Sequence, residues 1–338
     1  MTTGEVKAAR VAVLGAGAIA QVVHLPILTR MRGAQLVGLC DVDQGKAATL
    51  AQRFGVSRTY GSAEELWSDE AIDAVIVCTP SSLHEQQVID GLGGGKYVFC
   101  EKPLALTAEG TARVLATEGA RNRLMVGMNQ RFRPDAAALK SAVSNGQLGE
   151  VRFIRAGWLN RRAGKSAQGW RHEKQNAGGG ALMDLGIQML DLSLWVLDYP
   201  EPTRLVSYLH TPDGGEVEDS AILVVELDGG RVVNLEVTWT FVADRERQYL
   251  QVIGSGGSAG FPPLKIFTES SAGLVDASPE LPPGRENQFT ASYRQELGAF
   301  VEAVRGEQPI ETPSEQTTLM RIVEAAYRSA DESGEIHF

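Results

Sequence analysis

The chain has 338 residues, of which 43% are hydrophobic and 22% charged, values typical of a globular protein with two domains. Its net charge of -10 argues against binding to nucleic acid or to anionic membrane surfaces. No apolar stretch is long enough to span a membrane, and the polar residues 1–10 do not resemble a signal peptide. Cys40, Cys78 and Cys100 lack the spacing of a metal site. We therefore expect a cytoplasmic protein with buried, reduced thiols and no metal.

The first predicted element is a short apolar strand, residues 10–14, which runs into a glycine turn and a helix. Gly15 permits the tight turn, Gly17 lets the backbone approach a pyrophosphate, and the small Ala20 allows close helix–strand packing. The start of the helix then offers unpaired N–H groups to the anion. The pattern predicts a dinucleotide site that includes Gly15, Ala16, Gly17, Ala18 and Ile19.

A second predicted strand, residues 36–41, ends in the carboxylate expected to bind an adenosine ribose, Asp41. This side chain would accept hydrogen bonds from both ribose hydroxyls and repel a 2′-phosphate. Val42 and Asp43 supply no cation to offset that repulsion, and the nearest one, Lys46, lies a helical turn further on. We therefore expect NAD, rather than NADP, as the cofactor.

Predicted strands and helices alternate up to residue 127, which indicates a doubly wound parallel sheet. The expected strands after the first two are residues 58–60, 73–80, 97–103 and 124–127, and the expected helices are 44–54, 82–92 and 107–119, with a capping box at Ser62 and Glu65 opening another. Residues 1–127 are thus predicted to be an NAD-binding Rossmann domain.

The pattern changes in residues 128–338, where strands dominate. We expect strands at 151–158, 205–210, 220–227, 231–240 and 248–254, helices at 181–197, 293–305 and 314–329, a loop at 160–180, and irregular structure at 255–284. Alternation within 231–240 puts Val233, Leu235, Val237 and Trp239 on one face and polar residues on the other, as in an antiparallel sheet. These residues are predicted to form an α+β domain with an open antiparallel sheet, which binds substrate and mediates oligomerisation.

Several motifs together resemble the Gfo/Idh/MocA oxidoreductase family, and they occur in the family's order over nearly the whole chain. They are His24-Leu-Pro26, Thr79-Pro-Ser-Ser-Leu-His84, Glu101-Lys-Pro103, Asn129-Gln-Arg-Phe-Arg-Pro134 and Gly178-Gly-Gly-Ala-Leu-Met-Asp184-Leu-Gly186. The resemblance implies a nicotinamide cofactor between a Rossmann domain and an antiparallel-sheet domain. It also implies hydride transfer on sugars or cyclitols. The cofactor residues that it adds are Thr79, Pro80, His84, Glu101, Lys102 and Asn129.

The resemblance implies Lys102 and an Asp184–histidine pair as catalytic groups, but Gln188 occupies the histidine position. Glutamine cannot titrate and can only form hydrogen bonds. Asp184 and Gln188 are four residues apart, so they share a helix face, which Asp191 extends. We expect Lys102 to relay the proton, Asp184 to orient it and Gln188 to fix a hydroxyl. A purely structural Lys102 is the alternative.

The loop before Asp184 supplies further substrate-binding candidates. His172 could provide the missing imidazole, although a solvated loop histidine is the alternative. Trp170 could stack on a sugar or anchor the loop. Arg162, with Arg161 and Lys165, forms a basic cluster that could bind an acidic sugar or a phosphate, or lie in solvent.

We therefore expect an NAD-dependent dehydrogenase or reductase that acts on a CH–OH group of a sugar, sugar derivative or cyclitol. One alternative is a redox-neutral enzyme with tightly held NAD that eliminates or epimerises, and another is a non-catalytic dinucleotide or sugar sensor. The second face of the predicted sheet carries Ile222, Val224, Val232 and Thr238. That face is apolar enough to favour a homodimer or homotetramer, and family members commonly pair through this sheet.

Overall fold

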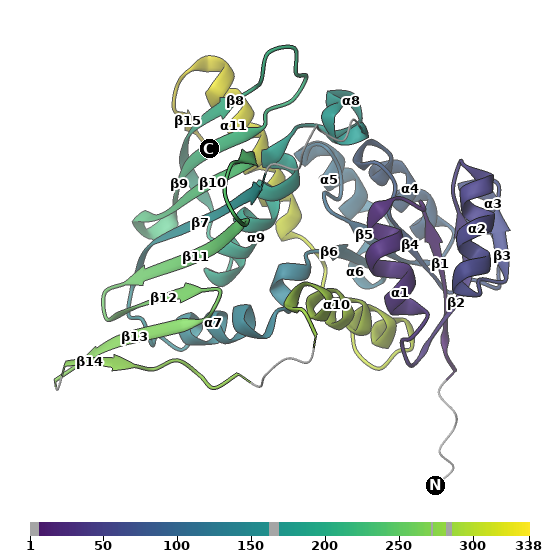
Figure 1. Cartoon of the computed structure of the whole chain (residues 1–338), viewed down its shortest axis with the longest axis horizontal. Helices are drawn as coiled ribbons and strands as arrows, with labels where there is room; N and C mark the ends of the chain where they lie inside the picture. The colour runs from purple at the N-terminus through teal and green to yellow at the C-terminus, as the bar shows by residue number, and fades with distance from the viewer. Residues whose placement is uncertain (1–6, 162–168, 272, 282–285) are drawn as a thin grey trace, which may run out of the picture. The chain divides into compact units, whose positions relative to one another are not determined.

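The structure of the protein is a computed structural model that describes residues 7–161, 169–271, 273–281 and 286–338. The chain forms two compact units (Figure 1). The first unit comprises Met1–Asn129 and Glu286–Ser314, and the second comprises Gln130–Arg285 and Glu315–Phe338.

The first unit is built on a six-stranded parallel sheet with the order β3-β2-β1-β4-β5-β6. Its strands are β1 (Ala9–Leu14), β2 (Ala34–Cys40), β3 (Arg58–Tyr60), β4 (Ala74–Val77), β5 (Tyr97–Glu101) and β6 (Leu124–Gly127). This order is that of the Rossmann fold, in which ligands bind at the carboxyl ends of the strands. The predicted doubly wound parallel sheet is therefore confirmed.

Helices cover both faces of this sheet. They are α1 (Leu25–Leu28), α2 (Gln44–Phe54), α3 (Ala63–Ser68), α4 (His84–Gly93), α5 (Ala108–Ala116), α6 (Ala120–Arg123) and α10 (Gln288–Val304). Helix α10 comes from far along the sequence, and its Leu297 and Phe300 are buried in one core with Val13 and Phe99. The shared core explains why α10 belongs to the first unit, whereas the sequence analysis assigned it to the segment 128–338.

Side-chain caps explain where several of these helices begin. The carboxylate of Asp43 accepts the N–H of Lys46 at the start of α2, 2.9 Å away. Ser62 Oγ accepts the N–H of Glu65 at 3.3 Å, as the capping-box pattern predicted for α3.

The second unit is built on a nine-stranded sheet with the order β14-β13-β12-β11-β7-β10-β9-β8-β15. Its strands are β7 (Val151–Arg161), β8 (Pro202–His210), β9 (Ser220–Leu227), β10 (Arg231–Phe241), β11 (Arg247–Gly254), β12 (Gly257–Phe261), β13 (Lys265–Ser270), β14 (Gly273–Asp276) and β15 (Ile336–His337). One pair departs from the expected antiparallel sheet, because β10 runs parallel to β7. The chain returns from β7 through helices to β8 and β9 before β10 pairs with β7, which makes a parallel pair possible.

Residues 257–261, 265–270 and 273–276 lie in the segment for which the sequence pattern predicts irregular structure, and this prediction is wrong for them. They form β12, β13 and β14, and main-chain pairing places Ala259 opposite Val252 and Ile266. Glycine and serine are poor strand formers in isolation, so the strands here depend on an existing neighbour, β11, rather than on their own composition.

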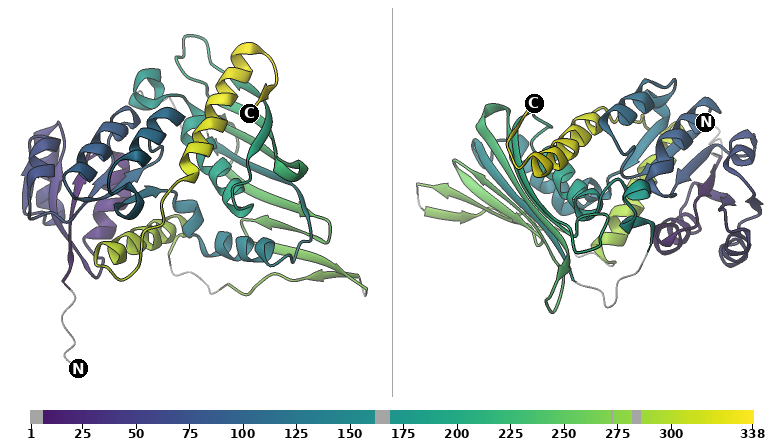
Figure 2. Two further views of the ribbon diagram at one scale, coloured as in Figure 1. Left: turned by 180° about the vertical axis from the view of Figure 1, so that it is seen from behind. Right: turned by 90° about the horizontal axis from the view of Figure 1, so that it is seen from above.

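Helices lie on one face of the nine-stranded sheet (Figure 2). They are α7 (Pro134–Ser144), α8 (Lys174–Ala177), α9 (Ile187–Val196) and α11 (Glu315–Glu332). Leu223, Val233 and Leu235 on the inner face are fully buried, whereas Ile222 and Val224 on the outer face are exposed. The alternation expected in 231–240 is therefore confirmed. Within the described residues, no helix is long and apolar enough to cross a membrane.

Candidate functional site

The glycine turn after β1 has the geometry that a diphosphate needs. Gly15 has a φ of +94°, and a Cβ there would lie 2.8 Å from the carbonyl oxygen of Cys78. A Cβ on Gly17 would meet only that same oxygen, at 3.9 Å, so the outer side of this residue is open. Helical structure begins at Ala18, which is exposed, and Ile19 is half-buried. An anion can therefore approach the backbone at Gly17 and the N–H groups of the first turn.

Asp41 lies beside this turn, at the carboxyl end of β2. Its Oδ2 accepts the N–H of Ala16 at 2.7 Å, and its Oδ1 accepts the N–H of Asp43 at 2.9 Å. Lys46 Nζ is 2.9 Å from the same Oδ1, although the sequence analysis discounted this residue as too far along the helix. Burial acts to raise the pKa of Asp41, but the two N–H groups and Lys46 outweigh it and hold the pKa below its usual value.

His84 connects the carboxyl ends of β4 and β5. It is fully buried, and its ring nitrogens lie 2.7 Å from the carbonyl oxygen of Pro103 and 2.9 Å from that of Thr79. Burial lowers the pKa of His84. The side chain thus ties the turn that holds Thr79 and Pro80 to the half-buried Lys102 and its neighbour Pro103. Both nitrogens face the protein, so a role for His84 in cofactor binding stays a prediction.

Two other predicted cofactor residues are engaged by the protein within the first unit. The buried Glu101 carboxylate lies 2.7 Å from Nε2 of His24, whose ring packs edge-on against Phe99. The side-chain amide of Asn129 donates to Ser292 Oγ at 2.9 Å, which joins the end of the Rossmann segment to α10. These bonds fix the backbone next to Lys102 and at the end of the Rossmann segment.

In the second unit, Asp184 lies on a π-helical turn, Leu182–Gly186, that leads directly into α9. Such turns are rare and occur frequently at functional sites. The buried Glu218 anchors the start of this turn, because one carboxylate oxygen accepts the N–H groups of Gly180 and Leu182, each at 2.9 Å. The hydroxyl of Tyr327 on α11 donates to the same oxygen at 3.1 Å.

The glycines that precede the turn allow this anchor to form. A Cβ on Gly180 would lie 1.8 Å from the main-chain oxygen of Glu218, which only a residue without a side chain avoids. Glycine in the Gly178-Gly-Gly segment is therefore needed because the segment before β9 approaches its main chain so closely.

Side chains from two other segments hold the carboxylate of Asp184. Trp239 Nε1 on β10 donates to its Oδ2 at 3.3 Å, and Arg171 Nε lies 3.8 Å from its Oδ1. Gln188 Nε2 donates to the main-chain oxygen of Asp184 at 3.0 Å. The Asp184 side chain remains 26% exposed, so it is accessible to a ligand. Gln188 thus contacts the main chain of Asp184, and a common ligand-binding face of the two side chains stays a prediction.

The loop candidates are brought to this carboxylate to different degrees. The exposed His172 ring lies 5.1 Å from that of Trp239, between centroids. The half-buried Trp170 instead packs under the guanidinium of Arg171, 4.6 Å from the ring centre. Arg162 and Lys165 lie outside the described residues. Whether His172 and Trp170 bind substrate stays a prediction.

Trp239 and Arg171 contact Asp184, but sequence reasoning did not select either of them. The sequence pattern places Trp239 on the apolar face of its strand. That placement could have pointed to the contact, because a tryptophan on this face is turned toward the helix that bears Asp184. Asp191 does not extend the ligand face. Its buried carboxylate instead pairs with Arg131, Nε to Oδ2 at 2.8 Å, and accepts the hydroxyl of Tyr199.

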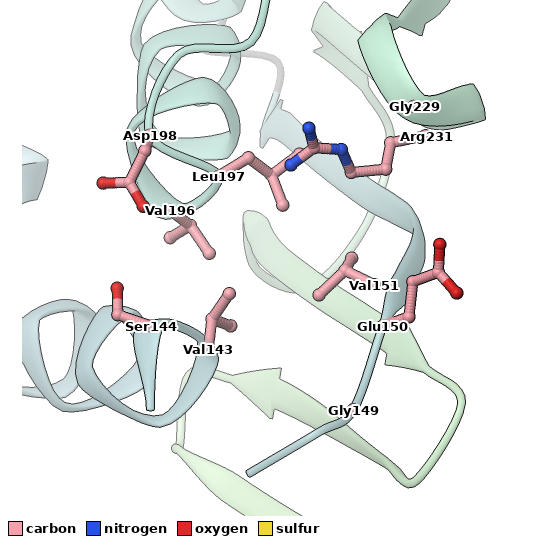
Figure 3. A pocket seen from close by; sticks show the side chains of 10 residues that line it. All are labelled: Val143, Ser144, Gly149, Glu150, Val151, Val196, Leu197, Asp198, Gly229 and Arg231. Atoms are coloured by element: carbon pink, nitrogen blue, oxygen red, sulfur yellow. The ribbon is translucent and has the colours of Figure 1, made fainter. Parts of the chain in front are cut away.

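A cavity of about 380 Å³ lies elsewhere in the second unit (Figure 3). The ends of α7 and α9 and the starts of β7 and β10 line it, and it contains none of the predicted site residues. Within the described part of the chain, no cluster of His, Cys, Asp and Glu could hold a metal ion.

Comparison with known proteins also separates the chain into an N-terminal and a C-terminal part near residue 130. Residues 9–129 match the oxidoreductase family with an NAD-binding Rossmann fold, and residues 136–260 match the GFO/IDH/MocA C-terminal domain. Inositol 2-dehydrogenase from Burkholderia cenocepacia (strain HI2424) is 30% identical over 88% of this chain and 86% of its own length. The chain belongs to the Gfo/Idh/MocA oxidoreductase family. It is therefore an NAD-binding oxidoreductase.

Other members of the Gfo/Idh/MocA family match nearly the whole chain. D-glucoside 3-dehydrogenase from Escherichia coli (strain K12) is 29% identical over 95% of each chain. The crystal structure of GenD2 from gentamicin A biosynthesis in complex with NAD has a TM-score of 0.84 and 26% identity, covering 98% of this chain and 97% of GenD2. At the glycine turn described above, the outer side of Gly17 is open, as the approach of a pyrophosphate requires.

Proposed function

We propose that the protein transfers hydride between NAD and a ring carbon of a sugar, sugar derivative or cyclitol. Relatives that match most of the chain are named for such substrates, D-glucoside and inositol. The observation that carries the proposal is the accessible carboxylate of Asp184, which Trp239 and Arg171 hold in place. A fixed, partly exposed carboxylate suits recognition of a sugar hydroxyl, since it accepts hydrogen bonds from alcohols.

The proposed chemistry needs a proton acceptor as well as a hydride acceptor. A secondary alcohol becomes a ketone when its carbon loses a hydride and its oxygen loses a proton. Nicotinamide supplies the hydride acceptor when it is bound. Lys102 Nζ would receive the proton and relay it to solvent, Asp184 would orient the reacting hydroxyl, and Gln188 would fix a hydroxyl through its amide.

The experiment that tests this function begins with an ultraviolet spectrum of the purified protein, to detect nucleotide that is already bound. A panel of sugars and cyclitols is then monitored at the absorbance of NADH. NAD-dependent turnover of at least one of them is the expected result. Failure of the whole panel, in both reaction directions, would contradict the proposal and leave the sensor alternative.

A redox-neutral reaction would use the same residues, and the same experiment separates it. Such an enzyme would retain nucleotide through purification and convert its substrate without added NAD.

We also propose a cytoplasmic location. The thiols of Cys40, Cys78 and Cys100 are buried and form no disulfide, which is compatible with a reducing compartment.

We further propose that the outer face of the nine-stranded sheet mediates self-association. Tyr208 and Ile222 are neighbours on adjacent strands and are 71% and 48% exposed, and Glu236 follows them on β10. Apolar side chains grouped on a flat face favour a second copy over water.

Replacing Ile222 with aspartate should therefore convert a homodimer or homotetramer to a smaller species. In the assembly, the new carboxylate would face either the same carboxylate of a second copy or an apolar surface of that copy. We therefore expect the association to weaken at least about tenfold. Light scattering at micromolar concentration measures the mass. Val242→Asp is the control, because Val242 is 82% exposed but lies outside the strands. A wild-type monomer would rule out the proposal.

A further inference from the structure

Lys46 has a contact that the dinucleotide site does not require. It lies in the first turn of α2, its side chain is 36% exposed, and its Nζ is 2.9 Å from Oδ1 of Asp41. The Asp41 side chain is only 8% exposed. A flexible lysine thus lies at the solvent side of the carboxylate that recognises the adenosine ribose.

The hydrogen-bonding capacity of Asp41 is nearly used up. A carboxylate offers about four acceptor positions, and the N–H groups of Ala16 and Asp43 occupy two of them. Lys46 occupies a third, so about one is left for a ribose that presents two hydroxyls. Both hydroxyls can bind only when Lys46 moves away, which its partly exposed, flexible side chain permits.

The same movement has the opposite consequence for a phosphorylated ribose. A 2′-phosphate would face the negative charges of Asp41 and of the nearby helix cap, Asp43. The Nζ group of Lys46 lies within hydrogen-bond distance of Asp41 and can turn toward such a phosphate, because its stem has four methylene groups. Gln44 is not a rival donor, since its amide already donates to the main-chain oxygen of Asp41 at 2.7 Å.

We propose that Lys46 determines the dinucleotide specificity of this protein. It competes with the ribose hydroxyls for Asp41, and it pairs with a 2′-phosphate when one is present. The protein therefore binds NADP as a second cofactor. Asp41 makes NAD bind more tightly than NADP, and Lys46 reduces the difference between the two affinities.

Titration of NADH and NADPH, followed by nucleotide fluorescence, tests the proposal without any sugar substrate. In Lys46→Gln we expect the ratio of the NADPH Kd to the NADH Kd to rise about tenfold, through weaker NADPH binding. NADH binding should become tighter, because the competing Nζ group is gone, and its saturation reports that the first unit is folded. Arg53→Gln is the matched control, because Arg53 lies on the same helix, over the ring of Phe54, and loses the same charge.

A double-mutant cycle with Asp41→Asn adds a second readout. Removing the acidic charge should lower the same ratio while Lys46 is present, and much of that gain should disappear in the double variant. NADPH binding to the wild type should also weaken with added salt more steeply than NADH binding. Three results would overturn the proposal: no saturable NADPH binding to the wild type, an unchanged ratio in Lys46→Gln, or an equal change in Arg53→Gln. A failure of sugar turnover would leave it unaffected.

Discussion

Replacing Lys102 with methionine should lower kcat on an oxidised sugar by at least about 100-fold and leave NADH affinity near the wild-type value. Methionine keeps an unbranched apolar stem but has no nitrogen to titrate, and a positioned acid–base group contributes roughly 10²–10⁴-fold to a rate. Gln188 cannot replace the lost proton carrier, because an amide does not titrate at accessible pH. Steady-state kinetics and nucleotide fluorescence measure the two quantities.

Two further variants show whether Lys102 carries the proton. Gln188→Ala removes a side chain worth about 0.5–1.5 kcal/mol as a hydrogen-bond partner, so a loss of about 2- to 12-fold is expected. His172→Ala should be similarly mild. If His172, which contacts Trp239, were the proton carrier, His172→Ala would be the severe variant instead. A mild Lys102→Met would then overturn our assignment.

Replacing Glu218 with alanine should destabilise the second unit by about 3 kcal/mol or more and reduce kcat. The N–H groups of Gly180 and Leu182 and the hydroxyl of Tyr327 would lose their common acceptor, and each unsatisfied buried group costs about 1–3 kcal/mol. Because the π-helical turn with Asp184 begins at Leu182, its carboxylate would also lose its fixed position. Urea unfolding, followed by intrinsic fluorescence, measures the loss of stability.

Glu218→Gln is the matched control for this prediction. Its amide oxygen can still accept from the same donors, so only the charge is lost, and the destabilisation should be about 1 kcal/mol. NADH binds the first unit and should be unaffected in both variants. An alanine variant as stable as wild type would show that water or a neighbouring group replaces the carboxylate.

The sequence alone determined the parallel sheet of the first unit and the identity of the family motifs. Gly15 and Gly17 predicted a diphosphate-binding turn because such a turn needs only a local backbone conformation and open space beside it. The alternation of apolar strands and capped helices is local as well, so it predicted the parallel sheet. Motifs also selected Lys102 and Asp184 as candidate catalytic residues, and Gln188 was selected by its departure from a motif.

Only the tertiary structure decided the contacts that join distant segments. The pairing of β10 with β7 in parallel, and the strands at 257–276, depend on neighbours that composition does not encode. Helix α10 completes the first unit because Leu297 and Phe300 fit a core formed by residues far earlier in the chain, for example Val11 and Phe99. Apolar periodicity predicts a helix, but it does not say which core will bury it.

The same limit applies to the candidate sites. Trp239 and Arg171 reach Asp184 only because β10 and the 170–172 turn fold against the helix that carries it. The sequence pattern placed Asp191 on the ligand face, but its carboxylate forms an ion pair with Arg131 from another segment. Lys46 was discounted for its distance along the chain, yet a long side chain on the first helical turn reaches Asp41. Residue types and spacing thus predicted the family and the candidate residues, whereas the partners of each charge were set by folding, since electrostatic contacts depend on distance in space.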